Sequence, residues 1–341
     1  MTRLLQAIAG AEHGGAEAFF ERLAVALHQA GLEQHLLIRA NPRRAAHLRG
    51  HGLQVTELPF GGALDLATRW GFRQAVAGFR PSHALTWMNR ATRFCPKGEF
   101  VHVGRLGGYY DLKYYRHCHH LIGNTPDIRS WLVDQGWPDE RAHYVPNFVA
   151  ATQAAPVARQ TFSTPGGAKV ILALGRLHAN KAFDTLIAAL AQVPDAYLWI
   201  AGEGPLLGEL ERQAARLGVI SRTRFLGWRD DVAALFAACD LFVCPSRHEP
   251  LGNVVIEAWA QAKPVVAAAA QGPSQLIFDG ENGLLAPVDD AVALAAAINR
   301  ALGDSDLVAR LARTGRGAYE AQFTEAAVVR NYLEFFQRVG R

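Results

Sequence analysis

The sequence predicts an α/β protein with two doubly wound parallel sheets, one in each half of the chain. Three observations carry this prediction. Short apolar runs alternate with amphipathic helical stretches in both halves, which is the pattern of a parallel sheet covered by helices on both faces. A segment rich in Pro, Gly, Ser and Thr, residues 151–167, lacks apolar periodicity and separates the halves. The length of 341 residues suits two domains of ordinary size.

The first predicted domain covers residues 1–150. Ala16–Gln29 and Asp127–Gln135 have the apolar spacing of amphipathic helices. Between and beside them lie six apolar runs of strand length: Leu4–Ala9, His35–Ile38, Val55–Leu58, Ala84–Met88, Phe100–Val103 and Leu121–Ile122.

The second predicted domain covers residues 168–322 and repeats the same rhythm. Its predicted strands are Val170–Leu174, Tyr197–Ala201, Arg224–Leu226, Leu241–Cys244 and Pro264–Ala268. Its predicted helices are Phe183–Gln192, Leu206–Leu217, Val232–Ala237, Val254–Gln261, Asp290–Leu302 and Asp306–Gln322. A last amphipathic helix, Thr324–Val339, falls in a separate terminal segment, residues 323–341.

Composition excludes several classes of protein. Half of the residues are apolar and 19% are charged, which argues against disorder. The four cysteines form no C-x-x-C pair, so neither a disulfide framework nor a zinc ribbon is expected, and a reducing cytoplasm fits best. No run approaches the ~18 apolar residues of a membrane span, so any membrane contact is expected to be peripheral. The net charge of +4 is concentrated in the first half, which predicts different partners for the two halves.

Charged residues follow the predicted strands of the second domain. Arg176 and Lys181 come after the first of these strands, beside a helix start, and two such cations suit a diphosphate. Glu249 and Glu257 flank a Pro- and Gly-containing turn before an apolar helix. The alternative is structural: the cations could be a solvated helix entrance, and either glutamate could only favour the helix dipole.

These motifs resemble the second domain of the retaining GT-B glycosyltransferases of family 4. Gly175, Arg176 and Lys181 match the family's G-R…K element, and Glu249 and Glu257 match its E-x7-E element. The resemblance also includes Gly272-Pro273-Ser274 and the turn at Asp279–Gly283, so that it covers most of residues 169–302. Ala182 departs from the family, which usually has glycine after the lysine.

The resemblance implies a GT-B fold, with the two domains facing across a cleft and the last helix crossing back to the first domain. It also implies that a sugar is transferred from a UDP- or GDP-linked donor, with retention, without a metal or other cofactor. In this reading Glu249, Arg176, Lys181 and His102 are catalytic. His102 is chosen as a histidine at a strand end, although Arg105 or Gly107 could align there instead. The donor-binding set is Gly15, Arg176, Lys181, Arg229, Glu249, Leu251, Gly252, Asn253 and Glu257.

The acceptor, a glycan or glycolipid of bacterial surface polysaccharide or lipopolysaccharide synthesis, is expected to bind the basic first half. Its loops over residues 60–116 interleave basic and aromatic residues, which also suits contact with an anionic inner-membrane surface. A solvated arginine-rich surface is the alternative. The predicted acceptor-binding residues are Arg105, Tyr109, Tyr110 and Lys113.

The sequence also leaves other functions open. A nucleotide-sugar 2-epimerase on the same fold, or a non-catalytic nucleotide-sugar-binding relative, is the runner-up. An NAD-linked oxidoreductase is disfavoured because no strand is followed by G-x-G-x-x-G. No nucleic-acid motif accompanies the basic charge. A literal D-x-D, Asp304 to Asp306, lies between two predicted helices where Asp306 is expected to be an N-cap, so no metal site is expected there.

Overall fold

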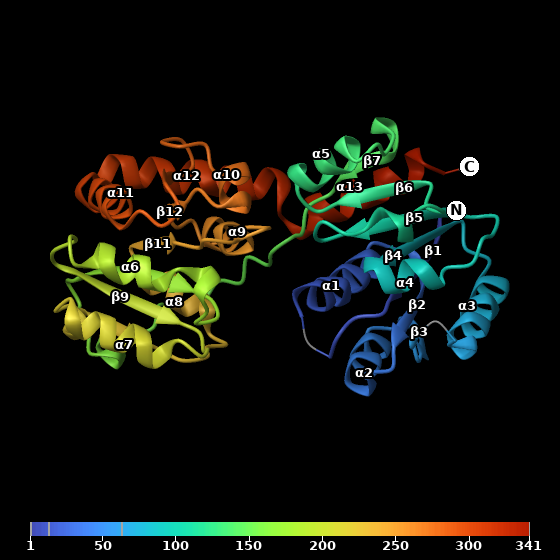
Figure 1. Ribbon diagram of the computed structural model, residues 1–341, viewed down its shortest axis with the longest axis horizontal. Helices are drawn as coiled ribbons and strands as arrows, with labels where there is room; N and C mark the ends of the chain where they lie inside the picture. The colour runs from blue at the N-terminus through green and yellow to red at the C-terminus, as the bar shows by residue number, and fades with distance from the viewer. Residues whose placement is uncertain (1, 13, 63, 341) are drawn as a thin grey trace. The chain divides into compact units, whose positions relative to one another are not determined.

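The computed structural model describes residues 2–12, 14–62 and 64–340. The chain divides into two compact units. The first runs up to Asn147 and resumes at Glu325, and the second spans Phe148–Thr324. Met1 and Arg341, the outermost residues of the predicted domains, lie outside the described residues. Each unit contains one wholly parallel sheet with helices packed on it (Figure 1), which confirms the predicted α/β class.

The sheet of the first unit has the strand order β3-β2-β1-β4-β5-β6-β7. The order reverses between β1 and β4, as in other doubly wound sheets. Its strands are β1 (Arg3–Ile8), β2 (Glu33–Arg39), β3 (Gln54–Leu58), β4 (His83–Trp87), β5 (Val101–Leu106), β6 (His120–Gly123) and β7 (Ala142–Tyr144). Its helices are α1 (Gly15–Gln29), α2 (Pro42–Gly50), α3 (Leu66–Phe79), α4 (Met88–Phe94), α5 (Pro126–Asp134) and α13 (Glu325–Arg338), with 3-10 turns η1 (Leu112–Tyr114) and η2 (Asp139–Arg141).

The last helix belongs to the first unit although it ends the chain. The Phe335 ring of α13 packs edge-on against His120 of β6 and lies 4.9 Å from the His143 ring of β7. Helix α13 accordingly lies beside β6 and β7 in Figure 1. Phe336 lies 5.3 Å from the His83 ring of β4. The amphipathic stripe of this helix is therefore buried on the first sheet, as the sequence predicted.

The sheet of the second unit has the order β10-β9-β8-β11-β12-β13. Alternate residues of its strands face opposite cores: Ile171 and Ala173 of β8 join one cluster, and Val170 and Leu172 join the other. Its strands are β8 (Lys169–Leu174), β9 (Ala196–Ala201), β10 (Thr223–Phe225), β11 (Leu241–Cys244), β12 (Val265–Ala268) and β13 (Leu284–Ala286). Its helices are α6 (Phe183–Leu190), α7 (Leu207–Arg216), α8 (Val232–Ala238), α9 (Asn253–Ala260), α10 (Gln271–Leu276), α11 (Ala291–Gly303) and α12 (Ser305–Gln322), with η3 (Arg159–Phe162), η4 (Ala179–Lys181) and η5 (Ile220–Arg222).

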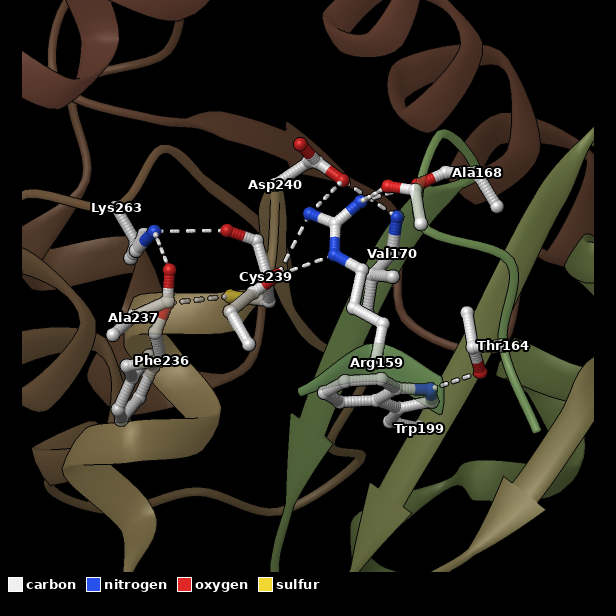
Figure 2. Close-up of polar contacts among 12 residues, drawn as sticks. Arg159, Thr164, Ala168, Val170, Trp199, Phe236, Ala237, Cys239, Asp240 and Lys263 are labelled. Atoms are coloured by element: carbon white, nitrogen blue, oxygen red, sulfur yellow. Dashed lines mark hydrogen bonds and ion pairs between the residues drawn. The ribbon is translucent and has the colours of Figure 1, made fainter. Parts of the chain in front are cut away.

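The predicted linker, residues 151–167, is built into the second unit. The Arg159 guanidinium donates to the Ala238 carbonyl at 2.7 and 3.0 Å and pairs with the Asp240 carboxylate at 3.0 Å (Figure 2). Thr164 accepts a 3.0 Å hydrogen bond from the buried Trp199 indole. The segment also packs Ala151, Val157 and Phe162 against the core, and the irregular spacing of these apolar residues hid the anchoring from the sequence.

Residues 60–116 contain more regular structure than expected: β4 and β5 confirm predicted strands, whereas α3 and α4 fall where loops were expected. Most of this range is α3, β4, α4 and β5, and the Asp65 side chain caps α3 by accepting from the Thr68 N–H at 2.9 Å. Ala63 lies outside the described residues. Among the helices of the described residues, none has the length and apolar content that a membrane span requires.

Candidate functional site

The candidate donor site is built at the carboxyl edge of the second sheet, where parallel sheets commonly bind ligands. The loop after β8 begins at Gly175, whose φ of 145° lies in the region that favours glycine. A Cβ there would approach the Lys181 side chain at 3.1 Å. Ala182, which replaces the usual glycine of the family, adopts a left-handed conformation with φ of 51° at the start of α6. The loop thus carries Lys181 back over the strand end.

Lys181 and Glu249 form an ion pair at this edge, although 68 residues separate them in sequence. The Lys181 ammonium donates to Glu249 Oε2, and the Ser246 hydroxyl donates to the same oxygen at 3.3 Å. The Lys181 and Glu249 side chains are 23% and 11% exposed, so the pair is partly shielded but within reach of a ligand. Burial, to which the nearby Glu249 carboxylate adds, raises the pKa of the Cys244 thiol to about 11.

Arg247 braces the loop that carries Glu249. Its guanidinium binds both carboxylate oxygens of Asp184 at 2.8 and 2.6 Å and pairs with Asp289 at 2.5 Å. It also donates to the Ala179 carbonyl at 2.8 Å. The backbone N–H of Arg247 adds a 2.9 Å bond to the Asn180 carbonyl. Two loops that carry the paired cation and carboxylate are therefore fastened to one another.

The turn from Glu249 into α9 depends on close backbone packing. Gly272 donates its N–H to the Glu249 carbonyl at 2.7 Å, and a Cβ on Gly272 would approach the Gly252 nitrogen at 2.6 Å. Gly252 is left-handed, with φ of 66°, and α9 begins at Asn253. The first N–H groups of this helix have no carbonyl one turn earlier to bind, so Leu251, Gly252 and Asn253 present a positive helix start.

A pocket of about 500 Å³ adjoins this arrangement. Gly175, next to the Lys181 side chain, is one of its lining residues, so the pocket lies beside the ion pair. The charged and aromatic part of the wall consists of Arg176, Glu203, Trp228, Arg229 and Glu257. Its cationic and carboxylate side chains can bind a phosphate and hydroxyl groups, and its apolar part can cover a planar ring.

Two residues of this wall have particular surroundings. Arg229 makes a two-pronged ion pair with Asp231, at 2.8 and 2.6 Å, which lowers the pKa of the Asp231 carboxyl. The Arg229 guanidinium at the pocket wall is therefore already paired with Asp231. Trp228 is 76% exposed, and its backbone N–H lies 3.4 Å from Glu203 Oε1.

His102 does not lie at a strand end, which corrects the sequence-based prediction. It is the second residue of β5 and 4% exposed, and its Nε2 lies 2.9 Å from the Thr86 hydroxyl. Burial lowers the pKa of the imidazole to about 3, so that it is neutral at physiological pH. The strand begins near the predicted place but runs three residues further, to Leu106, and this leaves His102 in the core.

The predicted acceptor residues have different surroundings. Burial raises the pKa of the Tyr110 phenol, and the nearby charge of Arg105 opposes this shift. Arg105 is 3% exposed inside the first unit. The Tyr109 hydroxyl donates to the Asp127 carboxylate, which with burial raises the pKa of the phenol. Tyr110 is partly buried, and Lys113 pairs with Asp111 at 2.6 Å. Gly15, predicted to face the donor, is the first residue of α1 in the first unit, and a Cβ there would meet no atom within 4 Å.

The D-x-D sequence serves as a helix cap. Asp304, rather than the expected Asp306, is the N-cap of α12, and its carboxylate accepts from the N–H groups of Asp306 and Leu307. Among the described residues no group of three or more His, Cys, Asp or Glu side chains has a metal-binding arrangement.

Arg247 and Trp228 are the two residues of the site that sequence reasoning missed. Arg247 lies two residues before Glu249, but its side-chain partners are more than 40 positions away in the sequence, so no local pattern reveals the brace. Trp228 had a signal, since a large aromatic residue follows Gly227 at a strand end.

Comparisons with known proteins agree with this geometry. A sequence model of the glycosyl transferases group 1 family matches residues 168–304, the segment that carries the site. The chain is 37% identical to the lipopolysaccharide core biosynthesis glycosyltransferase LpsE of Rhizobium meliloti (strain 1021), over 94% of this chain and 95% of that protein. It is 36% identical to LpsD of the same strain, over 95% of each.

A solved structure has the same fold. The crystal structure of Anabaena Alr3699/HepE in complex with UDP has a TM-score of 0.84 at 23% identity and covers 99% of this chain and 100% of that one. This likeness confirms the expected GT-B fold. Because the relatives exceed 30% identity over nearly the full chain and the family model covers the strand edge described above, the protein belongs to the glycosyl transferases group 1 family and is a glycosyltransferase.

Proposed function

We propose that the protein transfers a sugar from a UDP- or GDP-linked donor to a growing lipopolysaccharide core glycan, with retention of anomeric configuration and without a metal ion. The observation that carries the donor part is the Lys181–Glu249 pair, which lies beside the pocket that Arg176 and Glu257 line. The lipopolysaccharide core acceptor is supported by the names of the relatives LpsE and LpsD. A nucleotide donor is supported by the UDP in the Anabaena structure.

Stabilising the leaving diphosphate is the main chemical demand on this site. Lys181 has three N–H donors, so it can bind a phosphate oxygen while it still donates to Glu249. Arg176 is exposed at the pocket wall, and the start of α9 adds N–H groups with a positive dipole. Together these groups oppose the negative charge that develops as the glycosidic bond breaks.

The two glutamates have separate roles in this proposal. Glu249, beside Lys181, binds the donor sugar and faces the positive charge that develops at its anomeric carbon. Glu257 lies at the pocket wall and accepts hydrogen bonds from the ribose hydroxyls. The part-exposed Trp228 and the backbone around it cover the base.

The decisive experiment is a transfer assay with UDP- and GDP-sugars and a truncated lipopolysaccharide core as acceptor. Lys181→Ala and Glu249→Ala should each lower kcat by about 10³-fold, by loss of charge stabilisation. Lys169→Ala is the matched control, because Lys169 is exposed at the opposite end of β8. Near-normal transfer by Lys181→Ala would contradict the proposal.

The same assay tests metal use and stereochemistry. Full transfer in excess EDTA is expected, and its loss would contradict the metal-independent mechanism. The anomeric coupling constant of the product, measured by NMR, should match that of the donor linkage. An inverted product would contradict retention.

We also propose that α3 brings the protein to an anionic inner-membrane surface. Leu66 and Trp70 on this helix are 74% and 67% exposed, and Leu64 just before it is 92% exposed. Arg69 and Arg73 are exposed on the same helix. Exposed apolar side chains beside cations match the chemistry of anionic lipid headgroups.

Vesicle flotation tests this surface. Vesicles with 30% phosphatidylglycerol should retain the wild-type protein and lose the Leu66→Ser/Trp70→Ser double variant. Leu217→Ser is the control, because Leu217 is 42% exposed in the second unit. Equal retention of all three proteins would contradict the assignment to α3.

A further inference from the structure

Arg105 is a buried cation at the carboxyl edge of the first sheet. It is the fifth of six residues in β5, and it is aligned with Trp87 of β4 on one side and Ile122 of β6 on the other. The residue is 3% exposed. It thus lies in the middle of the edge where doubly wound sheets bind their ligands.

All the partners of this guanidinium are uncharged. Its Nε donates to the Tyr332 hydroxyl at 2.8 Å, and its Nη2 donates to the Asn147 side-chain oxygen at 2.5 Å. The ring centroids of Trp87 and Phe19 lie 4.3 and 4.8 Å from its central carbon. Among the described residues no carboxylate forms an ion pair with it.

A buried cation without a counter-ion is rare, because removing the charge from water is unfavourable. The two aromatic rings recover part of this desolvation cost by cation–π attraction. The two neutral hydrogen bonds fix the plane of the guanidinium. The guanidinium is therefore held in a fixed orientation, and its positive charge has no ion-pair partner among the described residues.

The third nitrogen of the group has no structural task. Nη1 has no hydrogen-bond partner among the described residues. It is not one of the unpaired polar atoms that are sealed from solvent, so solvent reaches it. A role in tying α13 to β5 accounts for Nε and Nη2 but not for Nη1. The Glu17 carboxylate forms no ion pair with Arg105 in the described part of the chain, and it accepts from the Ala11 N–H at 2.7 Å.

A second polar group at the same edge is also unsatisfied. Asn124 follows β6, and its backbone N–H binds the Leu106 carbonyl at the end of β5 at 3.2 Å. Its side chain is 6% exposed, and its Oδ1 has no partner in the described part of the chain. This oxygen is sealed from solvent, so it shows that the edge contains a second unsatisfied polar group but is not itself exposed to a ligand.

We propose that Arg105 binds an oxyanion, a phosphate or a carboxylate, that the acceptor glycan carries. The inference rests on the proposed function and deepens it, because it gives the acceptor a charge. The guanidinium binds the oxyanion through Nη1. A neutral acceptor would leave the positive charge of Arg105 without a counter-ion.

The test is anion binding by calorimetry at constant ionic strength, with inorganic phosphate and with glucuronate as probes. All proteins carry Lys181→Ala, which removes one cation of the candidate donor site, and the other groups of that site are the same in every protein compared. At least one anion should bind, and Arg105→Gln should weaken that binding at least about tenfold. Tyr332→Phe is the matched control, because it removes a partner of Arg105 but keeps the cation, and it should bind the same anion.

The two probes separate the two sources. A response to phosphate identifies a phosphorylated glycan, and a response to glucuronate identifies a sugar acid. If Arg105→Gln fails to fold, the guanidinium nitrogen signals of Arg105 in the Lys181→Ala protein should still shift in NMR spectra when the anion is added. Failure of both anions to bind, or equal binding by Arg105→Gln, would overturn the inference.

A parallel titration distinguishes this inference from the proposed function. Wild-type protein is titrated with UDP and with GDP. Absence of nucleotide binding contradicts the proposed function, whereas nucleotide binding without anion binding contradicts the role of Arg105 alone.

Discussion

Replacing Arg247 with alanine tests whether the brace at the donor site positions the ion pair. The substitution removes two bonds to Asp184, one ion pair to Asp289 and one bond to the Ala179 carbonyl. The side chains of Asp184 and Asp289 are 44% and 49% exposed, so their charges are well screened once unpaired. Because exposed pairs contribute ~0.2–1 kcal/mol each, we expect the free energy of unfolding to fall by about 1–2 kcal/mol.

The effect on transfer is expected to exceed the effect on stability. The backbone bonds from Arg247 and His248 to the Asn180 carbonyl remain in the variant, so the Glu249 loop shifts rather than unfolds. A shift of ~1 Å in a reacting group costs on the order of 100-fold in rate. We therefore expect kcat to fall by about 10- to 100-fold, while a urea titration shows a folded protein.

Arg316→Ala provides the control for a merely structural effect. Arg316 pairs with Glu320 at 2.7 Å on α12 of the same unit and has a similar exposure, 29% against 31% for Arg247. It should lose a similar amount of stability and keep its kcat. A wild-type kcat in Arg247→Ala, or an equal loss in Arg316→Ala, would refute the positioning role.

Three further predictions concern stability and the corrected histidine. Gly315→Ala should lower the free energy of unfolding by ~1–3 kcal/mol, because its Cβ would lie 2.4 Å from Trp259, whereas Gly317→Ala on the same helix meets nothing within 4 Å and should raise it by ~0.5–1 kcal/mol. Equal urea midpoints for the two would contradict the packing described. His102→Gln should destabilise the first unit, because it disturbs a buried hydrogen bond. It should keep kcat within about threefold of wild type, because a core residue does not contact the substrate. A loss of kcat by about 100-fold per folded molecule would show that His102 belongs to the active site. Burial lowers the pKa of His143 from 6.5 to about 4 in the folded protein. As the pH falls from about 6.5 towards 4, this imidazole takes up a proton in the unfolded chain but not in the folded one, so the free energy of unfolding should decrease. Thermal melts from pH 7.5 to 5.5 check this, and His143→Gln should weaken the dependence.

The sequence predicted the strands well because both faces of each sheet are buried. Continuous apolar runs such as Val170–Leu174 leave little choice of structure. Boundaries were less predictable: β5 ends at Leu106 rather than near His102, because polar residues inside a buried strand conceal its true length. The same difficulty concealed α3, whose exposed Trp70 and Leu66 break the expected amphipathic pattern.

The candidate site could be predicted in its parts but not in its assembly. The spacing of Glu249 and Glu257 already indicated a loop glutamate and a helix glutamate. That Lys181 pairs with Glu249, and that Arg247 holds both loops, depends on contacts between segments more than 60 residues apart. Arg105 was predicted as a basic surface residue, whereas its burial between Phe19 and Trp87 follows only from the fold.

Nucleotide binding measured by calorimetry shows whether Lys181 and the strand edge around it hold the donor. UDP and GDP are titrated into wild-type protein, Lys181→Ala and the control Lys169→Ala. If the carboxyl edge of the second sheet is the donor site, one nucleotide binds the wild type and the control equally, and binds Lys181→Ala at least about tenfold more weakly. Equal affinity in all three proteins, or no binding of either nucleotide, would contradict the account.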